Sequence, residues 1–230
     1  MRNQIYRTLL LNILIAVILL VTNGCSQGTT GILNVDNEDN TNIDKAALES
    51  IIDQNPAQGL NEIEKEGILY MREEEKLARD VYSKLYEIWN INNFNNIGSS
   101  EQTHMDAMAS LIEKYNLEDP ARDKDKGEFT NQKLQKLYDE LIEQGNKSEI
   151  DALKVGAAIE EIDIIDIEEY VGQTNKQDII TVYENLLKGS RNHLRSFVSV
   201  MKKRGITYEP QYLTDKQFDD IISAPVEKGK

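Results

Sequence analysis

The sequence predicts an all-α domain, on three observations. Apolar residues recur every three or four positions through several long segments, which is the spacing of a helix face buried against a core. The chain of 230 residues has only four prolines, and few runs of β-branched residues. It has no alternating strand pattern, glycine-rich phosphate loop or internal repeat. We therefore expect helices that pack on one another.

The first long helix is expected over residues 61–89. Its buried stripe is formed by apolar side chains at helical spacing, namely Ile68, Met71, Ala78, Val81, Tyr82 and Leu85. An asparagine-rich turn at 90–96 follows, and Ser99 and Ser100 then offer an N-terminal cap for a second helix that runs to residue 115. After a polar loop, a shorter amphipathic helix is expected at 132–143.

Two further long helices are expected in the second half of the chain. The third spans 148–171 and stops at Gly172, and the fourth spans 176–204 and stops at Gly205, because glycine readily takes the backbone conformation that ends a helix. Residues 208–212 are expected to pack back on the helices. A last short helix follows at 215–223.

The lengths of the connections predict how these helices are arranged. Short turns join the first helix to the second and the third to the fourth, so each pair is expected to be antiparallel. The segment between the two pairs is long enough to cross the full length of a bundle. The prediction is a ferritin-like four-helix bundle over residues 59–223, with one long crossover that contains a short helix.

The N-terminus has the features of a secretory signal peptide. Arg2 and Arg7 form a short basic start, and residues 8–21 are almost wholly apolar. An apolar stretch of about 14 residues is shorter than a membrane-spanning helix and suits a signal peptide. We predict a signal peptide at 1–24 and lipidation of Cys25, the only cysteine, which would make the protein an extracytoplasmic, membrane-anchored lipoprotein. An uncleaved anchor helix, or plain cleavage that leaves a secreted protein with a free thiol, are the alternatives.

The remaining segments are rich in polar residues. Residues 25–58 are expected to form a flexible tether with one short helix near 44–53, and residues 224–230 a disordered tail. The formal net charge of −14 repels nucleic acid and concentrates cations at the surface. We expect metal ions as ligands and no nucleic acid as a partner. Whether the protein forms a homodimer is left open.

The chain has two histidines, His104 and His193, and both lie in predicted long helices. Glu101 precedes His104 by three positions, so its carboxylate shares a helix face with the imidazole. Two such Glu-x-x-His steps, with one glutamate from each of two further helices, form the di-iron or di-manganese sites of helical bundles. Glu101, His104 and His193 are therefore candidate metal ligands.

Glu75 and Glu161 are the candidate ligands on the other two helices. Glu75 lies on the apolar stripe of the first helix, whereas the two glutamates before it point elsewhere. Glu161 lies in a segment that is apolar on nearly every side, where a buried carboxylate needs a partner or a metal. Glu160, with Asp163 one turn later, is an alternative to Glu161.

The fourth helix departs from the pattern. Ser190 stands three positions before His193, where a second Glu-x-x-His step would have its glutamate, and a serine cannot bridge two metal ions as a carboxylate does. The site would then have five protein ligands, and water, Glu160 or Asp163 are candidates for the remaining position. A mononuclear or asymmetric site is the alternative.

Other side chains are candidates for orienting the ligands. Tyr82 lies two turns after Glu75 on the same face, where it would donate a hydrogen bond to a ligand carboxylate or simply fill the core. Arg79, Arg191 and Asn192 would either orient ligands or pair with surface acids.

A resemblance to a known family lies in five segments, at 70–82, 101–104, 156–169, 189–195 and 208–212. Together they resemble a prokaryotic ferritin-like family known only as a domain of unknown function, and the similarity covers residues 60–222. Glu75, followed by Ala78, Arg79 and Tyr82, also resembles rubrerythrin. The resemblance implies a four-helix bundle with a dinuclear metal centre, but no reaction. Ser190 departs from the second Glu-x-x-His of rubrerythrin, and one cysteine cannot form its rubredoxin-like iron site, so peroxidase activity is not carried over intact.

Two functions fit these residues. One is an oxidoreductase or ferroxidase, in which two Fe or Mn ions are held by the glutamates and histidines and reduce O2 or peroxide. The other is a non-catalytic lipoprotein that binds metal or an envelope partner, which the acidic surface and Ser190 favour. In a third interpretation the histidines only fill the core.

Overall fold

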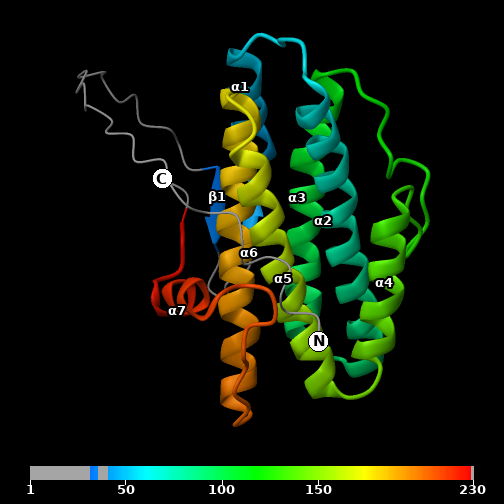
Figure 1. Ribbon diagram of the computed structural model, residues 1–230, viewed down its shortest axis with the longest axis vertical. Helices are drawn as coiled ribbons and strands as arrows, with labels where there is room; N and C mark the ends of the chain where they lie inside the picture. Colours follow the sequence, from blue (N-terminus) through cyan, green and yellow to red (C-terminus); the bar gives the residue numbers. More distant parts are fainter. Residues whose placement is uncertain (1–31, 36–40, 229–230) are drawn as a thin grey trace, which may run out of the picture.

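The structure, a computed structural model, describes residues 32–35 and 41–228. This part of the chain forms seven helices and one two-stranded sheet, which confirms the predicted helical class. Four long helices run lengthwise beside one another: α2 (Glu62–Trp89), α3 (Asn92–Lys114), α5 (Glu149–Val171) and α6 (Gln177–Lys203) (Figure 1). The most extensive contacts join α2 to α3 and α5 to α6, and smaller ones join α2 to α5 and α3 to α6.

Two shorter helices flank the long ones. α4 (Gln132–Gly145) lies in the long connection between α3 and α5 and packs on α2 and α5. α7 (Asp215–Ser223) lies across α6 (Figure 1). The short helices predicted at 132–143 and 215–223 are therefore present. Within the described residues, no helix is both long enough and apolar enough to cross a membrane.

The helices begin and end at residues with clear local causes. α2 starts with a capping box, in which the Asn61 side chain accepts a hydrogen bond from the Glu64 backbone N–H and the Glu64 carboxylate accepts one from the Asn61 N–H. It ends at Asn90, whose φ of 51° is left-handed. Ser148 caps α5 by accepting a hydrogen bond from the Asp151 N–H.

α3 starts earlier than the sequence predicts. The helix begins at Asn92, inside the asparagine-rich segment that we expected to form a turn. Phe94 and Ile97 explain the difference, because both are buried and Phe94 packs against Tyr82 and Phe197. The gain from burying these side chains outweighs the weak helix propensity of asparagine.

The segment expected to be a flexible tether is folded where the structure describes it. β1 (Leu33–Val35) and β2 (Thr41–Ile43) pair antiparallel, and α1 (Lys45–Gln54) forms where a short helix was expected. β2 packs on α3 and α6, as does α1, and Leu33, Thr41 and Leu48 are buried. The tether prediction is corrected for these residues, because their apolar side chains join the core.

Two further predictions concern the ends of the chain. Residues 224–228, expected to be disordered, are held by Glu227, which forms ion pairs with Arg191 and Arg195. The predicted signal peptide at 1–24 and the predicted lipidation site Cys25 lie outside the described residues.

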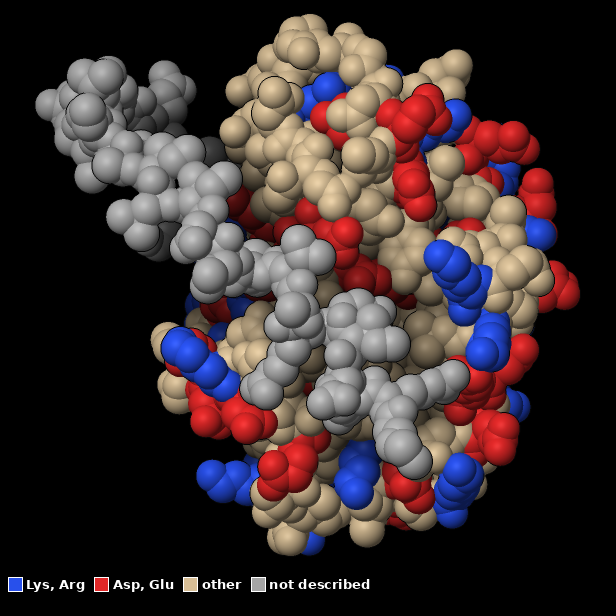
Figure 2. Space-filling model, viewed as in Figure 1, with Lys and Arg blue, Asp and Glu red and all other residues tan. Residues whose placement is uncertain are grey.

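The buried core has two hydrophobic clusters. Each of the helices α2, α3 and α6 contributes residues near one of its ends to the first cluster and residues near its other end to the second. Glu75, Glu101, His104 and His193 fall between the clusters, so a polar layer crosses the middle of the core. The surface carries Asp and Glu widely over the visible face, with Lys and Arg among them (Figure 2).

Candidate metal centre

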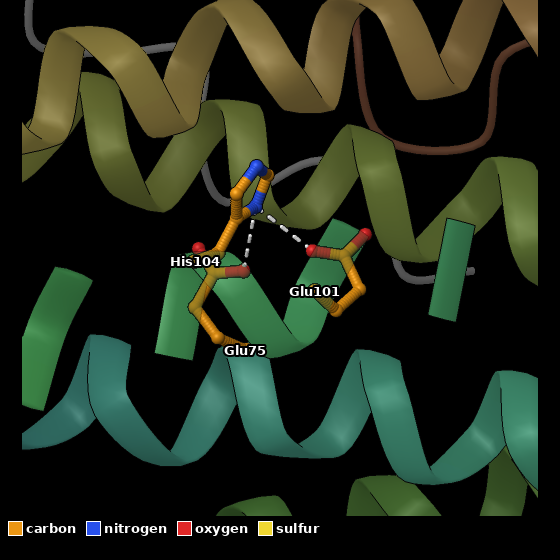
Figure 3. Close-up of side chains that lie close together, drawn as sticks. All are labelled: Glu75, Glu101 and His104. Carbon is orange, nitrogen blue, oxygen red and sulfur yellow. Dashed lines mark hydrogen bonds and ion pairs between the residues drawn. The ribbon is translucent and has the colours of Figure 1, made fainter. Parts of the chain in front are cut away.

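α3 supplies the centre of the polar layer. Glu101 and His104 are one turn apart on this helix, and Glu101 Oε2 lies 2.9 Å from His104 Nδ1. Glu75 reaches across from α2, with its Oε2 3.1 Å from the same nitrogen. Figure 3 shows the Nδ1 atom of His104 turned toward both carboxylates. The three residues form one compact group.

α6 and α5 supply a second group around the same glutamate. His193 Nδ1 lies 2.9 Å from Glu101 Oε1 and 3.5 Å from Glu160 Oε2. The two oxygens of Glu101 therefore face two different imidazoles, whose ring centroids are 5.4 Å apart. Glu101 is therefore common to both groups.

The donor atoms suit a pair of metal ions. In each group, Glu75–Glu101–His104 and Glu101–Glu160–His193, the potential ligand atoms lie within 4.8 Å of one another. Glu75 Oε1 is buried and has no hydrogen-bond partner among the described residues, while Glu101 Oε1 and Glu160 Oε2 are buried with His193 Nδ1 as their neighbour. Because unpartnered buried carboxylate oxygens are costly, imidazole and carboxylate donors in this arrangement fit Fe or Mn.

The charges within the centre shift every pKa. Burial acts to lower the pKa of both histidines, but carboxylates outweigh it: Glu101 and Glu75 raise the pKa of His104 to about 10, and Glu101 and Glu160 raise that of His193 to about 9. Burial also acts to raise the pKa of Glu101, but the His193 and His104 charges hold it below its usual value. Burial raises the pKa of Glu75 and of Glu160. Without metal, the protein therefore holds charged imidazoles against Glu101.

Glu160, and not Glu161, reaches this centre. Tyr82 donates a hydrogen bond to Glu160 Oε1 at 2.6 Å, which is one of the two roles that the sequence leaves open for this side chain. Glu161 points away and accepts hydrogen bonds from the Tyr208 hydroxyl and from the backbone N–H groups of Gln211, Tyr212 and Leu213. The placement of Glu161 at the centre is corrected, because its carboxylate is used to hold the segment after α6.

The other sequence candidates lie outside the centre. Arg79 pairs with Asp80 and donates to Gln102, and Arg191 pairs with Glu227. Asn192 donates to the Glu227 backbone. These three side chains therefore join surface or C-terminal contacts and do not orient the clustered carboxylates.

Comparison with known proteins supplies the family. Residues 64–225 match the family described as an uncharacterized protein domain, DUF2202. The chain belongs to this family. The uncharacterized protein MJ0754 of Methanocaldococcus jannaschii is 53% identical over 174 residues, which cover 76% of this chain and 94% of that protein. A crystal structure of hypothetical protein MJ0754 from Methanococcus jannaschii superposes with a TM-score of 0.73 over 75% of this chain and 98% of that one.

All five clustered side chains belong to the DUF2202 domain, and so does the departure at Ser190. Ser190 is buried, and its hydroxyl donates to the Leu186 carbonyl of its own helix at 3.2 Å. Beside it, a Cβ added to Gly189 would lie 2.5 Å from His104 Cε1. Small residues at this turn of α6 leave room for the imidazole, and they leave Glu101 as the one carboxylate between the two histidines.

Sequence reasoning missed Thr41, which precedes the DUF2202 domain. Its hydroxyl lies 2.6 Å from His193 Nε2, on the side of the ring opposite Glu101. This contact fixes the ring so that Nδ1 faces the carboxylates. Because 152 positions separate the two residues, no local spacing pattern could have indicated the pair.

We expect Thr41→Val to weaken metal binding by about tenfold, because the partner that orients the His193 ring is lost. Titration with Mn(II) under anaerobic conditions measures the change. Thr103→Val is the matched control, since the Thr103 hydroxyl accepts from the Ile43 backbone N–H and so attaches the same strand without touching an imidazole. An equal loss of affinity in both variants would show that the strand, and not the Thr41 hydroxyl, matters.

Proposed function

We propose that this chain is a ferritin-like protein with a dinuclear iron or manganese carboxylate centre, which acts as an O2- or peroxide-reducing oxidoreductase or ferroxidase. The observation that carries the proposal is the position of Glu101, whose two oxygens face His104 and His193 from opposite sides. The arrangement of α2, α3, α5 and α6, with α4 in a long crossover, supports the ferritin-like assignment.

Each residue of the centre has a distinct role in this proposal. Glu101 would be shared by the two metal ions, while Glu75 with His104 would hold one of them and Glu160 with His193 the other. The Tyr82 hydroxyl holds Glu160 Oε1, which leaves Oε2 free to bind. Bound Fe or Mn would supply the electrons for reduction of O2 or peroxide. Burial of all five ligands keeps bulk water away from this chemistry.

The proposal extends to location. A signal peptide at 1–24 and a lipid on Cys25 would place the centre on the extracytoplasmic face of a membrane, through features of the sequence alone. Labelling of cells with a radioactive fatty acid tests it, since Cys25→Ser would abolish incorporation into the protein. Incorporation that persists in this variant would contradict lipidation at Cys25.

The second candidate function is metal binding without turnover, in an envelope lipoprotein. Ser190 favours it, because a centre with a single bridging carboxylate has one anionic ligand fewer with which to support a change of metal charge. Under this function the two metal positions would be filled, but no substrate would be consumed.

Anaerobic reconstitution with Fe(II) tests both functions. We expect about two Fe per chain by elemental analysis, followed by O2 or peroxide consumption faster than that of Glu101→Gln protein under identical conditions. Full metal content with no acceleration would support the binding function. Protein that remains metal-free after reconstitution with Fe(II) and, separately, with Mn(II) would contradict the proposal.

Metal binding should also release protons. The pKa values of about 10 and 9 mean that both imidazoles carry a proton at neutral pH, and a metal ion displaces it. Burial raises the pKa of Glu75 and of Glu160 to about 7, so each is about half protonated at pH 7 and also loses its proton to the metal. We expect about three protons released per chain at pH 7 and an affinity that rises with pH until these groups have titrated. A pH indicator in weak buffer measures the release. Binding that strengthens as pH falls would contradict the prediction.

A further inference from the structure

A second set of carboxylates lies between the metal centre and the surface. On α5, Glu160, Asp163 and Asp166 follow one another at intervals of three residues, so each lies about one turn from the next along one side of the helix. Glu160 belongs to the centre, Asp163 is buried and Asp166 is partly exposed. α2 brings Glu74 to the same place, next to Asp166. The result is a series of acids that leads from solvent into the core.

The two inner acids of this series have no visible compensation. Glu74 and Asp163 are each 1% exposed, and all four of their carboxylate oxygens lack a hydrogen-bond partner among the described residues. Burial raises the pKa of Glu74 well above its usual value, and the neighbouring Asp166 and Glu75 charges raise it further. A buried carboxylate without a donor or a counter-charge is costly, so two adjacent ones call for a functional explanation.

The series is continuous at both ends. Asp163 lies one turn from Glu160 on α5, and its pKa is raised by burial and then by the charges of Glu74 and of the centre's glutamates, so Asp163 is close to both Glu74 and the centre. At the outer end, the Tyr70 hydroxyl donates to Asp166 Oδ2 at 2.9 Å. This bond fixes the Asp166 carboxylate beside Glu74.

We propose that Asp166, Glu74 and Asp163 form an uptake path that conducts divalent cations from solvent to the Glu101 centre. This inference rests on the proposed metal centre. Closely spaced acids in a low-dielectric interior concentrate cations and raise their rate of arrival. Among the described residues, neither Glu74 nor Asp163 belongs to a cluster of three or more candidate ligand residues, which suits transit.

The test compares rates of metal uptake by the full chain. Metal-free protein is mixed with Co(II) in a stopped-flow instrument, and the visible absorption of bound Co(II) is followed to its end point. The variant is Glu74→Gln with Asp163→Asn, which replaces both ionisable carboxyl groups with amides of nearly the same shape. Glu168→Gln is the control, because it removes one charge from an exposed position on the same helix.

We expect loading of the double variant to be slower by about tenfold or more, with the final absorption and metal content of wild type. The control should load at the wild-type rate. The double variant should melt no lower than wild type, because it loses two buried acids that the core solvates poorly. An unchanged melting temperature shows that slow loading does not come from misfolding.

The proposal has two contradicting outcomes. Equal rates in the wild type and the double variant would overturn the path while leaving the centre intact. A reduced final metal content in the variant would show that these acids are ligands and not a route. Failure of the wild type to bind Co(II) would instead count against the proposed function, so the two failures are distinguishable.

Discussion

Glu101→Gln is expected to abolish metal binding at both halves of the centre. Its two oxygens face both histidines, so one substitution removes a ligand from each position. Because loss of an outer-shell partner alone weakens binding 10- to 100-fold, loss of this shared ligand should weaken it by more than about 100-fold. Mn(II) titration of metal-free protein, with elemental analysis of the dialysed product, measures the effect.

Variants of the two unshared glutamates provide the comparison for Glu101→Gln. Glu75→Gln and Glu160→Gln each remove a ligand from one half only, so each is expected to retain about one metal per chain. Circular dichroism of the metal-free proteins checks folding, since loss of one partner from a buried ion pair costs about 3–5 kcal/mol. A Glu101→Gln protein that still binds two metals would show that this carboxylate does not bridge them.

Glu161→Ala is expected to destabilise the protein strongly without removing the metal centre. The substitution leaves the Tyr208 hydroxyl and the N–H groups of Gln211, Tyr212 and Leu213 without their acceptor. Removing one partner from such a buried charged network costs about 3–5 kcal/mol. For a domain of this size, the melting temperature should fall by about 10 °C, as measured by thermal unfolding of the metal-free protein.

Glu160→Ala is the matched comparison, because it is the adjacent residue on the same helix and is equally buried. We expect it to lose metal from the His193 half and to change the melting temperature less than Glu161→Ala does. The reverse pattern, in which Glu161→Ala loses metal and keeps its melting temperature, would show that Glu161 is a ligand of the centre.

The sequence was sufficient for most of the helices and for half of the centre. Glu101 and His104 are one turn apart, so any helix through them places both on one face. Apolar neighbours one turn to either side of Glu75 predict that it faces the core, and in the structure it reaches His104. Such inferences succeed because helical periodicity is a local property of the chain.

The choice between Glu160 and Glu161 could not be made in this way. α5 is buried on nearly all sides, so its apolar pattern does not indicate which face meets α2 and α6. Which of the two glutamates reaches the centre depends on residues 208–213, because their backbone N–H groups and the Tyr208 hydroxyl donate hydrogen bonds to the Glu161 carboxylate. The early start of α3 had a similar cause, because burial of Phe94 in the core overrides a local turn signal.

The helical class, the crossover helix and the short list of acids and histidines able to bind metal follow from sequence patterns. Tertiary packing sets which acids converge on Glu101, that Thr41 contacts His193, and that Glu74 lies close to both Asp166 and Asp163. Spacing within a helix is set by the geometry of a single hydrogen-bonded turn. The meeting of side chains from separate helices depends on how each helix is rotated, and the packing of the whole core sets that rotation.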